Sequence, residues 1–228
     1  MSKKPICIVD CAIKEKSLDS YERIKGNYNH PFEYHIPSME GMNSLHSSDD
    51  ARAYIILGSD SSVNDRLPWQ VALADFMKQS AQNKVPVMGI CFGHQLMADA
   101  FGGKVETSKT QKSPDSKNTF AGHREIKIIK DSFGFKKGES YKVFKAHSQE
   151  VTLISDQLDH LGTSDECLYD ILSHKKHPYL GLQGHPEAHI EFVERELPGL
   201  LTESEIMETI EGGEKIINNF IKYILKDF

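Results

Sequence analysis

Short apolar runs that end in turn-forming residues recur along the chain and predict buried β-strands. They cover residues 5–10, 53–57, 85–90 and 179–183. Between the second and third run, apolar side chains at helical spacing predict a helix over residues 69–84, which completes a strand–helix–strand unit. A further helical pattern begins directly after Cys91 and stops at Gly102 and Gly103. Strands joined through helices are typical of a parallel sheet, so we expect Cys91 at a strand-to-helix turn.

The second half of the chain carries a different pattern. Residues 108–119 are polar and include Pro114, which predicts a loop. A helix with one apolar face is predicted over residues 206–225. Three strand-like segments predict an antiparallel hairpin layer attached to the parallel core, and they are residues 124–129, 141–144 and 151–154. We therefore expect an α/β fold with a mostly parallel central sheet, a small antiparallel layer and a C-terminal helical extension.

Composition and charge narrow the class of protein. The 228 residues are 39% hydrophobic and 26% charged, which predicts one folded domain over residues 1–228. The net charge is -6 and the basic residues form no run, so nucleic acid is not expected as a partner. No apolar stretch approaches the roughly 20 residues that span a bilayer, so no membrane is expected, and the run over residues 6–9 is too brief for a signal peptide. We expect a cytoplasmic protein whose four cysteines are free thiols.

The segment from Gly89 to Gly93 has the form G-x-C-x-G, with Cys91 at its centre. A sharp turn from a strand into a helix leaves no room for large side chains beside the residue at its tip, and it strains the backbone of that residue. The amides at the start of the helix favour a thiolate and can bind a developing oxyanion. Cys91 is therefore a candidate nucleophile, although buried free cysteines without a chemical role are also common.

Two motifs together resemble those of the class I, or triad, glutamine amidotransferases. They are residues 89–96 followed by 102–105, and the segment G-L-Q-G-H-P-E over residues 181–187. The resemblance implies that Cys91 is the nucleophile, His185 the general base and Glu187 the carboxylate that orients the base, an arrangement that agrees with the needs of a cysteine nucleophile. It covers nearly the whole chain and implies a three-layer, flavodoxin-like fold.

Weaker parts of the resemblance concern the oxyanion hole and the substrate. The segment after the second predicted strand is similar to the family's glycine-rich loop, which implies that a backbone amide of Gly58 or Ser59 pairs with that of Phe92. The family commonly has a second glycine and a proline where this chain has serine and aspartate, so the inward-facing amide is not fixed. Residues 146–151 resemble the family's H-S-x-x-V segment, which holds the amino-acid end of glutamine. The implied substrate-binding residues are Gln95, His147, Ser148 and Gln149. For His147, a hydrogen-bonded turn is an equally good role.

The resemblance leaves two functions open. In the family, a synthase domain or subunit uses the ammonia that is released from glutamine, but residues 188–228 are too few for such a domain and no Walker-type loop occurs in the sequence. The sequence looks most like the stand-alone, guanylate-synthase-like branch that includes γ-glutamyl peptidases. We therefore expect hydrolysis of glutamine or of a γ-glutamyl compound. The alternative is a glutaminase subunit that serves a separate synthase, such as guanylate synthase, and the oligomeric state is left open.

Two further classes are weighed against this reading. A related group of cysteine hydrolases has a histidine directly after the nucleophile, where this chain has Phe92, which argues against that group. The second class is a non-catalytic binding or regulatory module on the same fold. An incomplete triad would indicate such a module, but Cys91, His185 and Glu187 are all present. No cofactor and no metal are expected, because the other histidines show neither H-x-x-x-H spacing nor a carboxylate constellation. In a self-sufficient hydrolase, the loop over residues 108–119 is expected to shape the substrate pocket.

Overall fold

The parallel half of the central sheet is built from the apolar runs of the sequence. The computed structural model describes residues 3–26, 28–45, 50–108 and 120–226. Four fully buried strands match the predicted runs: β1 (Ile6–Val9), β3 (Ala53–Ile56), β4 (Val87–Ile90) and β11 (Tyr179–Leu182). Each pairs in parallel with the next, and β2 (Phe32–His35) adds to β1 at the edge of the sheet. The predicted parallel core is therefore confirmed.

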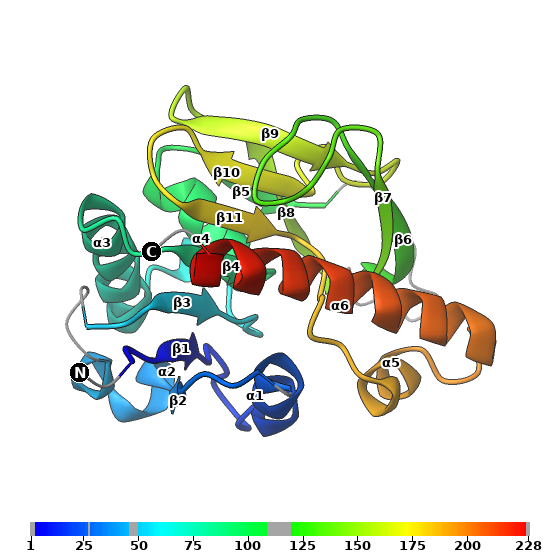
Figure 1. Cartoon of the computed structure of the whole chain (residues 1–228), viewed down its shortest axis with the longest axis horizontal. Helices are drawn as coiled ribbons and strands as arrows, with labels where there is room; N and C mark the ends of the chain where they lie inside the picture. The colour runs from blue at the N-terminus through cyan, green and yellow to red at the C-terminus, as the bar shows by residue number, and fades with distance from the viewer. Residues whose placement is uncertain (1–2, 27, 46–49, 109–119, 227–228) are drawn as a thin grey trace.

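Antiparallel strands continue the same sheet beyond β11. They are β10 (Ile171–His174), β9 (Leu158–Thr163), β6 (Phe120–Ile128) and β7 (Ser140–His147). Within the described ranges, the sheet has nine strands in the order β2-β1-β3-β4-β11-β10-β9-β6-β7 (Figure 1). The expected antiparallel hairpin is formed by β6 and β7. It extends the central sheet instead of forming a layer of its own.

The strand β8 (Gln149–Leu153) pairs with β5 (Lys104–Thr107) in a separate two-stranded sheet. Only Ser148 lies between the end of β7 and the start of β8. A hairpin needs at least about two residues in its turn, so the chain cannot fold β8 back along β7. The segment around Ser148 instead carries the chain from one sheet to the other.

Helices cover both faces of the central sheet and complete the three expected layers (Figure 1). Apolar residues of α3 and α4 pack on one face, and those of α1 and α6 pack on the other. Side chains of β1 alternate between these cores, with Ile6 and Ile8 on the α6 side and Cys7 and Val9 on the α3 side. The bounds of the helices are α1 (Leu18–Lys25), α3 (Pro68–Gln82), α4 (Phe92–Ala100) and α6 (Glu203–Lys226).

A third, smaller apolar cluster lies beyond the end of β11. It joins Phe144 of β7 and Ala188 to Val193 of α5 (Ile190–Glu196) and to Ile206 and Ile210 of α6. Because Ala188 belongs to the cluster, α5 is held beside the segment that follows β11. The remaining short helices are α2 (Pro37–Glu40), η1 (Met42–Ser44) and η2 (Val63–Asp65).

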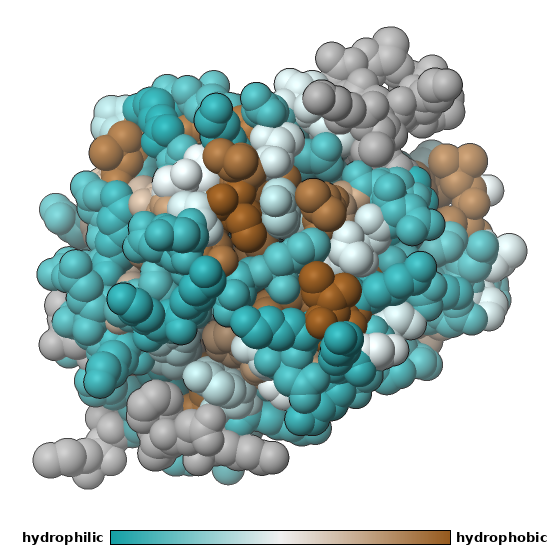
Figure 2. Space-filling view, turned by 90° about the horizontal axis from the view of Figure 1, so that it is seen from above, coloured by the Kyte–Doolittle hydropathy of each residue, from teal (hydrophilic) through white to brown (hydrophobic). Residues whose placement is uncertain are grey.

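The face of the molecule shown in Figure 2 is mostly polar. On the face shown in Figure 2, hydrophobic side chains lie in small, separate patches among hydrophilic ones. Scattered patches of this kind are normal on folded proteins and do not mark a binding surface. Among the helices described, none is long and apolar enough to cross a lipid bilayer.

Candidate active site

Cys91 lies at the tip of a sharp turn between β4 and α4. Its backbone has φ 49° and ψ −101°, a conformation that costs about 1–3 kcal/mol in a residue other than glycine. The flanking glycines are required by close backbone packing. A Cβ on Gly89 would lie 2.5 Å from the carbonyl carbon of Gly93, and a Cβ on Gly93 would lie 2.4 Å from the carbonyl oxygen of Ile56. The turn therefore holds the sulfur at the carboxyl end of the parallel strands, where open α/β sheets bind their ligands.

His185 and Glu187 follow β11, the strand that pairs with β4. The amide of His185 donates to the carbonyl of Phe144 at 2.7 Å, which ties this segment to β7. Nδ1 of His185 lies 2.9 Å from Oε1 of Glu187, so the carboxylate orients the imidazole. Burial lowers the pKa of His185, but the Glu187 carboxylate and the Cys91 sulfur outweigh burial and raise the pKa well above its ordinary value.

The side chains of Cys91 and His185 meet beside a shared backbone carbonyl. The carbonyl oxygen of Ala146 lies 4.0 Å from Sγ of Cys91 and 3.4 Å from Nε2 of His185. The nearby Cys91 sulfur contributes to the raised pKa of the imidazole. A Cβ on Gly58 would lie 3.3 Å from Cε1 of His185 and 3.7 Å from Cβ of Cys91. A larger side chain at position 58 would therefore crowd the sulfur and the imidazole.

The residues expected to bind substrate hold one another in place around the Gln149 carbonyl. Nε2 of Gln95 donates to this carbonyl at 2.7 Å, and Nδ1 of His147 lies 3.0 Å from it. Burial lowers the pKa of His147 to about 4, so the ring is neutral and its Nδ1–H donates. These contacts match the turn role that sequence considerations left open for His147. The Gln149 side chain accepts from Oγ of Ser62 at 2.6 Å, while Ser148 is exposed.

Two cavities meet at Cys91, and Ser59, Asp60 and Ala146 also line both. The first, which we call the His185 cavity, has a volume of about 410 Å³ and is lined further by His185, Glu187, Lys14, Glu15, Phe192 and Arg195, among others. The second, which we call the Gln95 cavity, has a volume of about 430 Å³ and is lined further by Ser61, Ser62, Gln95, His147, Ser148 and Gln149, among others. All four expected substrate-binding residues thus line the second cavity, and the expected base lines the first.

Of the residues whose amides are expected in the oxyanion hole, Gly58 and Ser59 line a cavity at Cys91 and Phe92 follows Cys91 directly. Phe92 is the first residue of α4, where a backbone amide has no carbonyl partner within the helix. Gly58 and Ser59 follow β3 and line the His185 cavity. The Ser59 hydroxyl lies 2.8 Å from that of Ser61, so its side chain is engaged within its own loop. Which of the two loop amides faces a substrate oxygen stays a prediction.

Two buried contacts beside the site were not expected from the sequence. Nε2 of Gln183 donates to Sγ of Cys91 at 3.7 Å, and its own Oε1 accepts from Gln95 at 3.2 Å. Lys145, next to Ala146, is fully buried and pairs with the equally buried Asp170 at 2.5 Å. Gln183 stands inside the second motif, so its position offered a signal. A lysine within a strand offers none, because its partner comes from a distant part of the chain.

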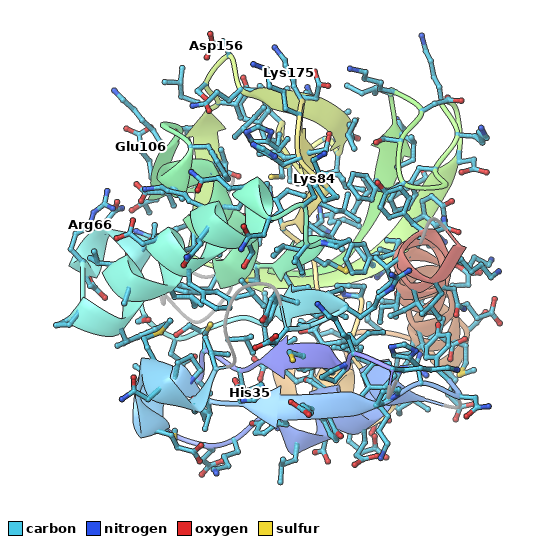
Figure 3. The ribbon with its side chains drawn as sticks, turned by 60° about the vertical axis from the view of Figure 1, so that its left-hand side comes forward. His35, Arg66, Lys84, Glu106, Asp156 and Lys175 are labelled. Atoms are coloured by element: carbon cyan, nitrogen blue, oxygen red, sulfur yellow. The ribbon has the colours of Figure 1, made fainter. Side chains whose placement is uncertain are left out.

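A second cluster of potential ligand atoms lies on strands β1 and β2. Among the described residues, ligand atoms of Cys7, Glu33 and His35 lie within 4.8 Å of one another, and Figure 3 labels His35 on β2. None of these residues lines either of the cavities at Cys91. Burial and the nearby Glu33 raise the pKa of Cys7 to about 12, which disfavours the thiolate that a metal ion requires. Motif spacing does not reveal this group, because pairing of the two strands creates it.

The site geometry defines a class of protein. A cysteine on a strand-to-helix turn, beside an imidazole that a carboxylate orients, is the arrangement of hydrolases with a cysteine nucleophile. The family model described as glutamine amidotransferase class-I matches residues 32–197. The chain therefore belongs to the class I glutamine amidotransferase family, and the resemblance inferred from its two motifs is confirmed.

Relatives named for two different activities are similar to this sequence. The glutamine-hydrolyzing subunit of the GMP synthase of Methanosphaera stadtmanae is 33% identical over 139 residues, which are 60% of each chain. The γ-glutamyl peptidase 2 of Arabidopsis thaliana is 31% identical over 170 residues, which are 71% of this chain and 65% of the plant protein. The matched stretch thus spans less than two thirds of either relative.

Solved structures of the family share the fold. The glutamine amido transferase of Methylobacillus flagellatus superposes with a TM-score of 0.76 at 22% identity, covering 97% of this chain and 96% of that one. A glutamine amidotransferase of Thermotoga maritima gives a TM-score of 0.70 at 19% identity, with coverage of 97% and 96%. The expected α/β fold, with a large sheet between layers of helices, is therefore confirmed.

Proposed function

We propose that this chain hydrolyses the γ-amide of glutamine or of a γ-glutamyl compound through a thioester on Cys91. The observation that carries the proposal is the placement of three side chains: Glu187 is hydrogen-bonded to His185, and His185 and Cys91 both approach the carbonyl of Ala146. A carboxylate that orients an imidazole, which in turn serves a thiol, is what covalent amide hydrolysis needs. Family membership supports the same reaction class.

The proposed reaction has two halves, formation of the thioester and its hydrolysis. In the first, His185 takes the proton of the Cys91 thiol, the sulfur attacks the amide carbon, and the amide of Phe92 with a loop amide of Gly58 or Ser59 holds the oxyanion. The C–N bond then breaks, and the imidazolium of His185 gives its proton to the departing nitrogen. In the second half, His185 takes a proton from water, which attacks the thioester, and the Cys91 sulfur leaves with a proton.

The Gln95 cavity is the proposed binding site for the glutamyl portion of the substrate. Gln95, Ser148 and Gln149 line it with backbone and amide groups, and Ser61 and Ser62 add hydroxyls. Polar groups of this kind can hold the amino and carboxylate ends of glutamine without a metal or a cofactor. The loop that sequence considerations assigned to the pocket lies, for residues 109–119, outside the described part of the chain.

Turnover by the purified chain tests this proposal. The protein alone, without nucleotide or second protein, is expected to release ammonia from glutamine or glutamate from γ-glutamyl dipeptides. Released ammonia and glutamate are measured separately, because ammonia reports only glutamine and glutamate reports both substrates. Absence of both products over a pH series from acid to alkaline would contradict hydrolysis by the isolated chain.

A second function, that of a glutaminase serving a separate synthase, is favoured by particular relatives. Several are described as glutamine-hydrolyzing subunits of GMP synthase, and a structural neighbour is described as PurLQS of Thermotoga maritima. In that case the isolated chain would be idle with glutamine. A large increase in glutamine hydrolysis on adding a candidate synthase with its nucleotide substrates would select this function over the stand-alone hydrolase.

The proposal extends to the organisation and location of the protein. We treat residues 1–228 as one amidotransferase-like domain that acts in the cytoplasm. Its described cysteines, Cys7, Cys11, Cys91 and Cys167, are free thiols, which suits a reducing compartment. A non-catalytic module on the same fold is disfavoured, because such a module has no need of an oriented imidazole beside the cysteine.

A further inference from the structure

The direction in which a leaving group departs follows from the position of His185. In amide hydrolysis, the imidazole that removes the thiol proton must also protonate the departing nitrogen, so that nitrogen has to lie on the imidazole side of the sulfur. His185 lines the His185 cavity and not the Gln95 cavity. With the glutamyl portion in the Gln95 cavity, whatever is attached to the amide nitrogen extends into the His185 cavity.

The size of the His185 cavity exceeds the needs of ammonia. Its volume is about 410 Å³, whereas a molecule the size of water occupies roughly 30 Å³ in the liquid. Cavities of about 300–1,000 Å³ are typical of sites that hold whole small molecules. A cavity this large beside the departing nitrogen is suited to a substituent on the amide.

The wall of the His185 cavity carries one residue well suited to bind a carboxylate. The guanidinium of Arg195 lies over the ring of Phe192, 5.0 Å from its centroid, and both residues line the cavity from α5. A planar guanidinium stacked on an aromatic ring can present paired N–H donors to a carboxylate. Nε of Arg195 lies 3.3 Å from Glu196, but both side chains are exposed, so this pair contributes little stability and exchanges partners easily.

A second cation, Lys14, reaches the same cavity from the segment after β1. It lies 3.3 Å from Asp60, and this pair is also solvent-exposed. The cavity is also lined by the acidic residues Glu15, Asp60 and Glu196, which would instead favour a leaving group that carries a cationic amine. Arg195 favours a carboxylate in the leaving group because its stacking on Phe192 places the guanidinium at the cavity wall.

We infer that the His185 cavity is a leaving-group subsite for an amino acid or short peptide, and that Arg195 binds the carboxylate of this leaving group. The inference rests on the proposed function and specifies its substrate class: γ-glutamyl amino acids and peptides. In the reaction, the C–N bond to the leaving group breaks, the nitrogen takes the proton from His185, and the amino acid or peptide departs with a free amine. No oxidant or co-reactant other than water is required.

Four substrates test this subsite in the purified chain: glutamine, γ-glutamyl-alanine, γ-glutamyl-alaninamide and γ-glutamyl-putrescine. The alaninamide differs from the alanine compound only in lacking the carboxylate, and the putrescine compound carries a cation instead. Because charge-assisted hydrogen bonds at partly exposed sites contribute modestly, we expect kcat/KM for γ-glutamyl-alanine to exceed that for γ-glutamyl-alaninamide by about tenfold. Arg195→Ala should reduce this ratio to about one, and Arg195→Lys should keep part of it.

The matched control is Lys130→Ala, which removes an exposed cation that pairs with Asp159 and lines neither cavity. It should leave the ratio at the wild-type value. Equal rates for the alanine and alaninamide compounds in the wild type, or a preference for the putrescine compound, would overturn the inference. Hydrolysis of glutamine without hydrolysis of any γ-glutamyl amino compound would overturn it as well while leaving the proposed function standing. Failure with all four substrates would overturn both.

Discussion

Nδ1 of His185 lies 2.9 Å from Oε1 of Glu187, and the two side chains are only 10% and 7% exposed. The pair sits in the short segment after β11, which is itself tied to β7 by the hydrogen bond from His185 to Phe144. A charged carboxylate this close to a buried imidazole favours the imidazolium. This geometry supports the proposed roles, in which Glu187 positions and stabilises the imidazolium and His185 carries out the proton transfers.

Glu187→Gln should lower kcat/KM without abolishing turnover. An amide can still orient the ring by a hydrogen bond, but it lacks the charge that stabilises the imidazolium. We expect a loss of about 100-fold or more, measured with glutamine or a γ-glutamyl dipeptide, while the thermal unfolding curve keeps its cooperative shape. An unchanged rate would show that Glu187 does not serve His185.

The same substitution should change the pH profile in a defined direction. Glu187 raises the pKa of His185, so its removal lowers that pKa. The protonated imidazole needed for nitrogen departure is then lost at lower pH, and the alkaline limb of the kcat/KM profile moves toward acid. A raised folded-state pKa also contributes stability that is complete below the unfolded value of about 6.5 and is lost as pH rises through the folded value. The stability difference between wild type and Glu187→Gln should accordingly shrink at alkaline pH.

Substitutions at Cys91 separate chemistry from backbone strain. Cys91→Ala removes the nucleophile but keeps a Cβ in the same strained conformation, so it should abolish turnover and leave the fold intact. Cys91→Gly should also be inactive, yet it relieves the positive-φ strain and should unfold at a higher temperature than Cys91→Ala. The difference is expected to be about 1 kcal/mol after the greater freedom of glycine in the unfolded chain is counted. Equal melting temperatures would contradict the strain at this position.

Gly213→Ala should damage the site although alanine is the better helix former. A Cβ on Gly213 of α6 would lie 2.4 Å from the carbonyl oxygen of Pro186, between His185 and Glu187. Alanine gains about 1 kcal/mol over glycine in a helix interior, but here it must push the catalytic segment away. Because small displacements of catalytic groups are costly, we expect kcat/KM to fall by about 100-fold. Glu211→Ala, at an exposed position of the same helix, is the control and should have little effect on the rate.

Lys145→Met should destabilise the protein by about 3–5 kcal/mol, because it leaves Asp170 buried without its partner. Burial already raises the pKa of Asp170, which Lys145 opposes, so the substitution raises it further. A raised carboxyl pKa makes stability fall as pH increases, and the variant should therefore lose stability between about pH 4 and neutrality. Denaturant unfolding across this range measures the effect. The double variant Lys145→Met with Asp170→Leu should recover much of the loss; no recovery would show that the charge of Asp170 is not the cause.

The turn at Cys91 was predictable because its close packing requires glycine at two fixed positions, which gives the G-x-C-x-G pattern. A Cβ on Gly89 would lie 2.5 Å from the backbone of Gly93 within the same turn, and a Cβ on Gly93 would lie 2.4 Å from the Ile56 carbonyl of the adjacent strand β3, so both positions require glycine. The parallel strands were equally visible, since burial on both faces makes a strand apolar throughout. The helix after Cys91 was visible through its apolar spacing and its glycine stop.

The rest of the site depends on contacts between distant segments, which spacing rules do not encode. The Ala146 carbonyl approaches the Cys91 sulfur because β7 contacts the segment after β11. Lys145, the neighbour of Ala146 on β7, pairs with Asp170, which is distant in the sequence. Strands β7 and β8 lie in different sheets because only Ser148 separates them, and a pattern of apolar residues does not predict where one strand ends and the next begins. The two cavities at Cys91 likewise emerge only from the assembled fold.

The most direct test of the account is capture of the γ-glutamyl thioester on Cys91. The purified chain is mixed with a γ-glutamyl dipeptide, quenched in acid within the first turnover, and analysed by intact-mass and peptide mass spectrometry. The account predicts a γ-glutamyl adduct on the peptide that contains Cys91, absent from Cys91→Ala and more abundant in Glu187→Gln if deacylation is slowed. Turnover with no adduct on Cys91, or equal turnover by Cys91→Ala, would contradict covalent catalysis at this residue.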